Sequence, residues 1–532
     1  MPRKTVLVAS LLLPVVVLAA CSFSGRSEHK SRLVYGLTLA PAGIDPHVDV
    51  SSELGIPLSS VYDTLVFRTE DGQFVPGLAE SWDVSADGTV YTFRLRHGVR
   101  FHDGTAFNAS AMLRTLQRIA DPETKSRKAV LLLGPYQSGE VVDPYTIKIT
   151  LSEPFAPLLD SLSQVYLAPA SPAALDKWGA DYQLHQVGTG PYMMKEYVPN
   201  DHLTLVRNPD YDWGPSLHSQ RGQANVDEIE FRFLVEPSVR LPSLEAGDVD
   251  VVGEVPPQDA SRVGQDQELR LAPVAIPGLP LVAFLNTQAS PTDDLDVRKA
   301  LILATDRQTL VQTVFGRYSP VAAGPFSHNH VDYAPEVENL YSYDPQTAAQ
   351  LLERAGWVLD PQTGLRAKDG VPLQLQAYVM SWGLVPQVSQ MLQAQWRQVG
   401  IDLVINEVTF TAALAAAKEN KHNLIFWSEP GTDGDLLRSF FDSENVGGRN
   451  WSNASLPALD DLLARARREG DPERRRQLYG EAQVTIMEEA LVLPIRDYVN
   501  LNAYRACVEG LSFDSRGWFP ILHDVKLGDA CR

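Results

Sequence analysis

The sequence predicts a mixed α/β protein built from two to four domains. Its 532 residues are too many for one hydrophobic core, because single cores stop growing well below this length. Apolar residues make up 44% and charged residues 21% of the chain, which is the balance of a folded globular protein. Near residue 185 the local pattern changes from short alternating strands to longer units in which helices and strands follow one another. We therefore expect an antiparallel α+β part followed by an α/β part.

The first part of the chain carries strand, turn and cap signals in a clear order. Residues 33–39 form a strand-like run, and residues 81–96 alternate on either side of an Asp87-Gly88 turn, which predicts a β-hairpin. Asn108 is suited to cap a helix that continues through Ile119. Residues 145–151 alternate again and predict another strand.

The second part shows helix signals separated by strands. Asp344-Pro345 places a capping residue before a proline in the first turn of a helix, and Gly356 ends that helix. Residues 386–399 predict a helix that leads into an apolar strand at 401–405. Asp471-Pro472 repeats the cap signal before a long helix that ends near residue 490.

The N-terminus has the layout of a secretory signal. Arg3 and Lys4 precede an apolar run, 6–17, of about a dozen residues, which is short of the roughly 20 that span a bilayer as a helix. Leu18-Ala19-Ala20-Cys21 resembles a bacterial lipobox, which implies a signal peptide at 1–20 and a lipidated tether at 21–31. Two or more acyl chains on Cys21 would hold the protein stably at a membrane. The alternatives are an ordinary secretion signal with a chance cysteine and an uncleaved anchor helix.

Charge and cysteine content narrow the class of protein. The formal net charge is −20, and about −22 once Arg3 and Lys4 are removed with the signal, which argues against nucleic acid as a partner. Of the three cysteines, Cys21 is assigned to the lipid. Cys507 and Cys531 would then either form a disulfide or remain as two thiols outside the cytoplasm.

The chain carries no recognisable catalytic or cofactor motif. Nucleophile elbows, zinc-protease helices, phosphate loops and zinc-type cysteine pairs are missing from the sequence. His328 and His330 could grip a metal, but nearby carboxylates would be needed, so a solvated loop is the preferred interpretation. We therefore expect no enzyme, no cofactor and no metal site.

A series of motifs resembles the family 5 solute-binding proteins of ABC importers, which include dipeptide, oligopeptide and nickel binders. The matching stretches keep the family's order over about residues 33 to 500, and they are GIDP at 43–46, VYDTLV at 61–66, VPGLAESW at 75–82, YTFRLR at 91–96, GVRFHDG at 98–104, VGTGPY at 187–192, RNPDY at 207–211, FLNT at 284–287, VRKAL at 297–301 and AGW at 355–357.

The resemblance implies a two-lobed, class II periplasmic-binding-protein-like α/β fold with a hinge and an extra α+β domain inserted in the first lobe. Lobe I would comprise residues 31–58, 184–280 and 495–532, the inserted domain 59–183, and lobe II 281–494. A ligand would be enclosed as the lobes close. The protein would act as a lipid-anchored monomer on the outer face of the cytoplasmic membrane or in the periplasm, and would deliver its ligand to a membrane permease.

The resemblance also points to residues that would line the ligand site. In peptide binders of the family an aspartate shortly after a tryptophan pairs with the ligand's ammonium group. Here Trp427 matches, and Glu429, Asp433 and Asp435 compete for the role of that carboxylate. Asp433 and Asp435 could instead cap a helix that begins at residue 436.

Four further positions are candidates, and three of them, Ser51, Ser52 and Asn286, are assigned by the same resemblance. Ser51 and Ser52 lie where relatives contribute polar contacts, although they could simply cap a loop. Trp382 is a candidate aromatic wall of the pocket or a core residue. Asn286 is interpreted as a hydrogen-bonding residue of the hinge.

The resemblance implies a peptide as the ligand. Nickel or a metal chelate, with His328 or His330 as the visible ligands, and an oligosaccharide stacked on Trp382 and Trp427 are the alternatives on the same scaffold. A lipid-anchored hydrolase is the contrasting class. The sequence does not indicate peptide length, side-chain preference or the permease.

Overall fold

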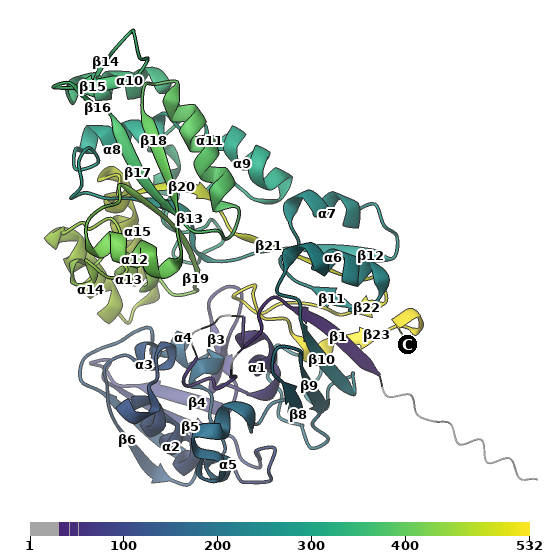
Figure 1. Ribbon diagram of the computed structural model, residues 1–532. Coiled ribbons are helices and arrows are strands. Elements are labelled where there is room, and N and C mark those ends of the chain that lie inside the picture. The colour runs from purple at the N-terminus through teal and green to yellow at the C-terminus, as the bar shows by residue number, and fades with distance from the viewer. Residues whose placement is uncertain (1–30, 42, 50, 52, 532) are drawn as a thin grey trace, which may run out of the picture.

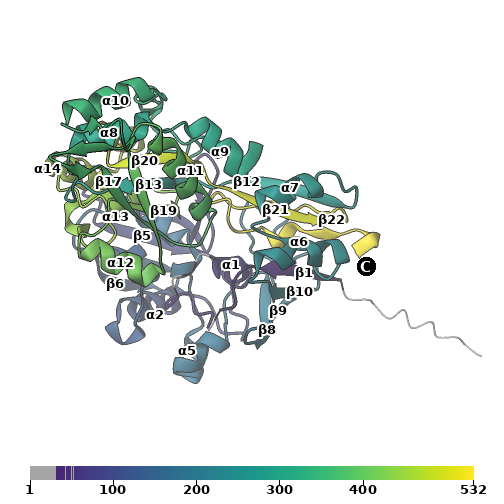
Figure 2. The same cartoon turned by 45° about the horizontal axis from the view of Figure 1, so that its top comes forward.

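The computed structural model describes residues 31–41, 43–49, 51 and 53–531. They form two lobes, with a third body packed on the first lobe (Figures 1 and 2). Lobe I is built on a seven-stranded sheet in the order β12, β21, β11, β1, β10, β9, β8. β1 pairs in parallel with β10 and β11, and the other pairs are antiparallel. The bounds are β1 Arg32–Leu37, β8 Tyr192–Val198, β9 His202–Arg207, β10 Glu228–Phe233, β11 Val251–Val252, β12 Leu269–Ala275 and β21 Val499–Arg505, with α1 Gly55–Val61, α6 Pro237–Ala246 and α7 Pro257–Val263 beside the sheet.

The inserted domain is centred on a four-stranded antiparallel sheet in the order β4, β5, β7, β6. Its β4–β5 hairpin and the helix capped by Asn108, whose side chain accepts from the Ala111 N–H, confirm the sequence predictions. The bounds are β2 Val66–Arg68, β3 Phe74–Pro76, β4 Ala79–Val84, β5 Val90–Leu95, β6 Tyr136–Asp143, β7 Thr146–Leu151, α2 Ala109–Ala120, α3 Lys128–Leu133, α4 Leu158–Leu162 and α5 Pro172–Trp178.

Lobe II contains a five-stranded sheet in the order β18, β17, β19, β13, β20. The helix caps predicted at Asp344 and Asp471 are confirmed, because both side chains accept hydrogen bonds from N–H groups of the first turn. The bounds are β13 Gly278–Leu285, β17 Gln374–Val379, β18 Asp402–Glu407, β19 Leu424–Pro430, β20 Val492–Arg496, α8 Leu295–Leu303, α9 Arg307–Phe315, α10 Pro345–Arg354, α11 Val385–Arg397, α12 Phe410–Lys418, α13 Leu436–Phe441, α14 Pro457–Arg468 and α15 Pro472–Glu488, with a small sheet of β14 Val358–Leu359, β15 Arg366–Lys368 and β16 Val371–Pro372.

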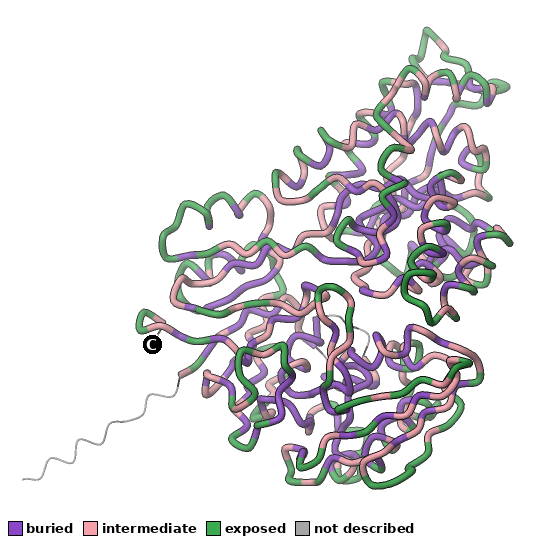
Figure 3. The backbone as a smooth tube through the Cα atoms, turned by 180° about the vertical axis from the view of Figure 1, so that it is seen from behind, coloured by how far each residue is buried: buried purple, intermediate pink, exposed green. Residues whose placement is uncertain are grey.

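The apolar cores respect the division into lobes, and Figure 3 shows the buried backbone gathered within each lobe. One buried cluster joins a face of the lobe I sheet to the inserted domain, so these two parts form one packed unit. A second cluster packs α6 and α7 on lobe I, and two more belong to lobe II. Among the described residues, the buried members of each cluster come from one side of the hinge. The lobes can therefore rotate without opening an apolar core.

The C-terminal segment is fastened to lobe I. Cys507 and Cys531 are joined by a disulfide with their Cα atoms 5.6 Å apart. Between them, β22 (Val508–Glu509) pairs with β23 (Lys526–Leu527). The same segment carries Arg516, whose Nη2 donates to the Ser163 hydroxyl of the inserted domain at 2.7 Å, and Trp518, which is described below.

Candidate functional site

A cavity of about 350 Å³ lies between the lobes, beside the two segments on which the chain crosses. Both lobes contribute to its wall, which is the arrangement expected of a small-molecule site between domains. The lining residues are Glu254, Ile276, Pro277, Leu279, Trp382, Trp427, Ser428, Glu429, Pro430, Tyr498 and Trp518.

The crossing segments lie between β12 and β13 and between β20 and β21. The Ile276 N–H donates to the Tyr498 carbonyl at 2.9 Å, so the two crossings are tied together. Asn286, by contrast, lies beyond the far end of β13. Its side chain bonds to Asn420, His422 and Asn453 of lobe II. The prediction that Asn286 is a hinge residue is therefore wrong: it organises loops inside lobe II.

Aromatic side chains cover both walls of the cavity. Trp382, which follows β17, and Trp427 in β19 are in edge-to-face contact with their ring centroids 5.6 Å apart. Tyr498 and Trp518 lie 5.9 Å apart on the lobe I side. The indole N–H groups of Trp382 and Trp518 have no hydrogen-bond partner in the part of the chain that the structure describes. The walls thus offer flat apolar surface, while these two indole N–H groups are buried without a partner in the described part of the chain.

Of the three carboxylates that follow Trp427, only Glu429 lines the cavity. It belongs to β19, where it pairs with Leu279 of β13. One carboxylate oxygen, Oε2, accepts from the Trp427 indole N–H at 3.0 Å and from Arg449 Nη2 at 2.8 Å. Glu429 therefore reaches the cavity with a cation already beside it.

Asp433 and Asp435 are turned into lobe II, which corrects their assignment to the ligand site. Both oxygens of Asp433 accept from Arg475, at 2.6 and 2.8 Å. Burial alone would raise the pKa of Asp433, but the Arg475 guanidinium holds it below its usual range. Asp435 occupies the N-cap position of α13 without a side-chain cap bond, and Asp433 accepts from its N–H. Burial, followed by the charge of Asp433, raises the pKa of Asp435 to about 6.

On the lobe I side the cavity is lined by Glu254. Its φ of 49° places it in the left-handed region, where a non-glycine residue stores strain of about 1–3 kcal/mol. The Asn500 side chain, 246 residues away in sequence, accepts from the Glu254 N–H at 2.9 Å and holds this geometry. The Tyr498 hydroxyl donates to Oε1 at 3.1 Å.

A second carboxylate, Glu53, is buried near Glu254. It accepts from the Thr38 N–H at 2.9 Å and from the Thr38 hydroxyl at 2.7 Å. Burial, and then the charge of Glu254, raise the pKa of Glu53. Lobe I therefore has one carboxylate, Glu254, in the wall of the cavity and a second, Glu53, buried close enough to interact with it.

The predicted serines contribute differently from the expectation. Ser51 donates its N–H to Asp49 at 2.7 Å, and its carbonyl accepts from the Tyr166 hydroxyl at 2.8 Å. It is not among the lining residues, and its contacts are those of a loop turn. Ser52 and Cys21 lie outside the described residues.

The two histidines point to different partners. His328 Nδ1 lies 2.6 Å from Asp497 Oδ2. His330 is 3% exposed and stacks on Phe326 with the ring centroids 3.9 Å apart, so the expectation of a solvated loop is wrong at this position. Burial lowers the pKa of His330 to about 3. Within the described residues no group of three His, Cys, Asp or Glu side chains is placed to hold a metal ion.

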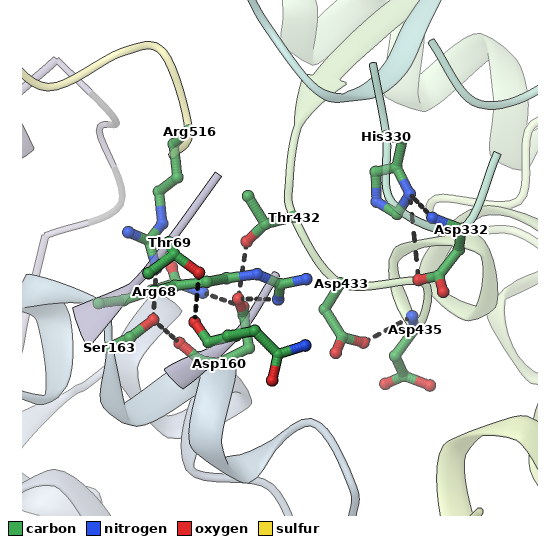
Figure 4. Close-up of polar contacts among 12 residues, drawn as sticks. Arg68, Thr69, Asp160, Ser163, His330, Asp332, Thr432, Asp433, Asp435 and Arg516 are labelled. Atoms are coloured by element: carbon green, nitrogen blue, oxygen red, sulfur yellow. Dashed lines mark hydrogen bonds and ion pairs between the residues drawn. The ribbon is translucent and has the colours of Figure 1, made fainter. Parts of the chain in front are cut away.

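The lobes also touch at a second place, away from the cavity, which we call the distal contact: residues 153–160 of the inserted domain against Thr432, Arg467 and Arg468 of lobe II. The Thr432 hydroxyl donates to Asp160 Oδ1 at 2.7 Å, and Arg68 Nη1 lies 2.6 Å from the same oxygen (Figure 4). The Ala156 N–H donates to the Arg467 carbonyl at 3.0 Å, and Arg468 lies 2.9 Å from Glu153.

Comparisons with known proteins agree with this geometry. The description "Bacterial extracellular solute-binding proteins, family 5 Middle" matches residues 73–448. The glutathione-binding protein GsiB of Salmonella choleraesuis is 30% identical, over 85% of this chain and 86% of that protein. The chain belongs to this family. A di/tripeptide-binding protein of Pseudomonas aeruginosa is 28% identical over 99% of the chain and 100% of the relative. The structure of NikA from Brucella suis in complex with Fe(III)-EDTA superimposes with a TM-score of 0.84 at 25% identity, covering 93% and 99% of the two chains.

As a family 5 solute-binding protein, the chain is a binder and not an enzyme, and its two-lobed fold is that of the family. Sequence reasoning missed Glu254, Tyr498 and Trp518, because the segments that carry them meet only at the hinge. The one local signal was Trp518, a large aromatic residue between Gly517 and Phe519 in a polar segment. No helix of the described residues is long and apolar enough to cross a membrane.

Proposed function

We propose that this protein captures a short peptide in the interlobe cavity and delivers it to an ABC importer. The observation that carries the proposal is the cavity at the hinge, where aromatic walls from both lobes enclose two carboxylates, Glu254 and Glu429. The names of the relatives from Pseudomonas and Salmonella, which refer to di- and tripeptides and to glutathione, support the same class of ligand.

The chemistry of a peptide fits these walls. Its ammonium group needs a carboxylate, since a charge removed from water is tolerated only when it is paired and hydrogen-bonded. Contacts made to both lobes at once favour the closed arrangement, so binding shifts the population toward it.

We also propose that Cys21 carries the lipid that keeps the protein beside its permease, where it works as a monomer. A Cys21→Ala variant should then appear in the soluble fraction of fractionated cells, while the wild type stays with the membranes. Equal distribution of the two proteins would contradict the anchor.

Oligosaccharide binding is the second candidate, favoured by Trp382 and Trp427, whose rings could stack on sugar faces. A nickel or metal chelate is the third, since the Brucella structure contains Fe(III)-EDTA. A hydrolase would turn over what it binds, whereas a binding protein gains only thermal stability as ligand is added.

The test is a thermal-shift screen of the purified protein. Di- to hexapeptides, their N-acetylated forms, maltooligosaccharides and nickel with histidine are added separately. We expect the unfolding temperature to rise with peptide concentration. Native mass spectrometry of the protein as purified identifies any ligand retained from the cell. A shift with sugar or with nickel and histidine, and none with peptides, would overturn the proposal.

A further inference from the structure

We propose that Glu254 of lobe I is the group that receives the ligand's ammonium, and that Glu429 of lobe II is a structural wall of the cavity. This inference rests on the proposed function and names the residue that makes the site selective for a free amino terminus. It assigns the role to the lobe opposite to the one that the family resemblance indicates.

Glu429 is already neutralised by its own lobe. Its Oε2 accepts from both Arg449, at 2.8 Å, and the Trp427 indole. Lys128 of the inserted domain also interacts electrostatically with Glu429. A ligand cation placed there would meet two like charges, and it would have to displace a charge-assisted hydrogen bond.

Glu254 is held differently. Arg240 Nη1 lies 3.7 Å from Oε2, beyond hydrogen-bond length, and Arg496 also interacts electrostatically with Glu254, but among the described residues neither guanidinium donates a hydrogen bond to its carboxylate. The Arg240 donors are used on backbone carbonyls, namely those of Leu234, Val235 and Glu254 itself. The Tyr498 hydroxyl therefore fixes the carboxylate in place, and the negative charge of the carboxylate is only partly compensated by the protein.

The surroundings of Glu254 also suit a cation. Trp518 lines the same side of the cavity, and aromatic faces attract ammonium groups, whereas the neighbouring Tyr498 ring already has the Arg496 guanidinium 4.5 Å from its centroid. The described residues that line the cavity include these two glutamates, Glu254 and Glu429, and no Lys, Arg or His. Asn500 holds the strained backbone of Glu254 through a hydrogen bond. Backbone strain of this kind is often retained at functional sites, where it positions a side chain.

The experiment measures how strongly N-acetylation of the ligand weakens binding, in the wild type and in variants. The probe is the tightest-binding member of the di- to hexapeptide panel, and Kd is determined by isothermal titration calorimetry. We expect acetylation to raise Kd by about 10- to 100-fold in the wild type, the range of a hydrogen bond to a charged group. In Glu254→Gln the same change should raise Kd less than about threefold.

Glu429→Gln is the matched control, because it removes the other carboxylate of the same cavity. It should retain the full acetylation effect. Glu254→Asn is the second variant if Glu254→Gln does not fold, since Asn tolerates the left-handed backbone better than most residues. It too should lose the effect.

The outcomes separate the two proposals. If no peptide binds, the proposed function fails and this inference fails with it. If peptides bind and N-acetylation raises Kd by the same factor in Glu254→Gln or Glu254→Asn as in the wild type, the inference alone is overturned. Loss of the acetylation effect in Glu429→Gln, with Glu254→Gln unchanged, would return the role to lobe II.

Discussion

Two of the places where the lobes face each other are built on opposite principles. At the hinge, the cavity presents aromatic surface and a carboxylate, Glu254, that accepts no hydrogen bond from a cation among the described residues. At the distal contact, the central ion pair is matched within the protein, although the Arg467 Nε has no hydrogen-bond partner among the described residues. Arg68 and Asp160 have side chains only 6% and 5% exposed, and Thr432 from lobe II completes the shell of Asp160.

The difference indicates how closure is divided between protein and ligand. The distal contact needs nothing from outside, so it contributes to closure whether or not a ligand is present. The cavity has unmet hydrogen-bonding and charge, so its contribution depends on what enters it. We infer that the distal contact sets the basal closed population and that the ligand supplies the remainder.

Removing Asp160 should have the largest effect on stability. Asp160→Ala leaves the buried Arg68 without its partner and Thr432 without its acceptor. Breaking one half of a buried ion pair typically costs about 3–5 kcal/mol. We therefore expect the free energy of unfolding, measured by urea denaturation without ligand, to fall by that amount.

The control is Asp83→Ala, which breaks a pair of similar length, 2.8 Å to Arg94, with side chains 66% and 57% exposed. Exposed pairs contribute about 0–1 kcal/mol, so this variant should stay close to the wild type. An equal fall in the free energy of unfolding in both variants would mean that the buried ion pair of the distal contact stabilises the protein no more than an exposed pair does.

The same contrast explains what the sequence could and could not predict. Caps such as Asn108 and Asp471 are local signals, and their helices are as predicted. The choice among Glu429, Asp433 and Asp435 depends on Arg475, which lies 42 residues after Asp433 and approaches it only in the folded lobe. Glu254 is placed by Asn500, on the far crossing of the hinge. Local patterns predicted the scaffold, and the charge balance of the site needed the tertiary structure.

A change at Asp435 should alter the pH dependence of stability. Its pKa is raised to about 6 by burial and then by the charge of Asp433, while Arg467, Arg475 and Arg438 oppose the rise. A carboxyl whose folded pKa exceeds its unfolded value destabilises the protein once it ionises. Stability is thus lost as the pH rises from about 4 through 6. One pKa unit corresponds to about 1.36 kcal/mol, so Asp435→Asn should remove about 3 kcal/mol of that loss, of which roughly half falls between pH 5 and pH 8.

The measurement is urea denaturation of the wild type and Asp435→Asn at pH 5 and pH 8. The difference between the two proteins isolates Asp435 from other groups such as Asp332, whose pKa burial also raises to about 6. The free energy of unfolding of Asp435→Asn minus that of the wild type should be larger at pH 8 than at pH 5. A difference that does not change between these pH values would contradict the assignment.

Thr432→Val tests the distal contact without disturbing its ion pair. The change keeps the shape of the side chain and removes the hydroxyl that crosses to Asp160. One buried hydrogen bond is worth about 1 kcal/mol, so peptide affinity should fall about fivefold although Thr432 does not line the cavity. Small-angle scattering without ligand should show a larger radius of gyration.

Thr485→Val is the matched control, since its hydroxyl donates to Glu481 within α15. It should leave both affinity and radius unchanged. If Thr432→Val also leaves them unchanged, the distal contact does not bias closure.

Trp518→Phe should have the smallest effect on stability and still change binding. The Trp518 indole N–H has no partner among the described residues, and a buried donor without a partner costs about 1–3 kcal/mol, which offsets part of the lost ring area. We expect the free energy of unfolding to change by less than about 1 kcal/mol, with weaker peptide binding by calorimetry. Trp451→Phe makes the same substitution at a residue whose indole N–H likewise has no partner among the described residues, but which is 2% exposed and packs on Phe284 and Phe440. It leaves a void in lobe II, so it should cost clearly more stability. If Trp518→Phe costs as much as Trp451→Phe, Trp518 is a core residue and the cavity loses its lobe I wall.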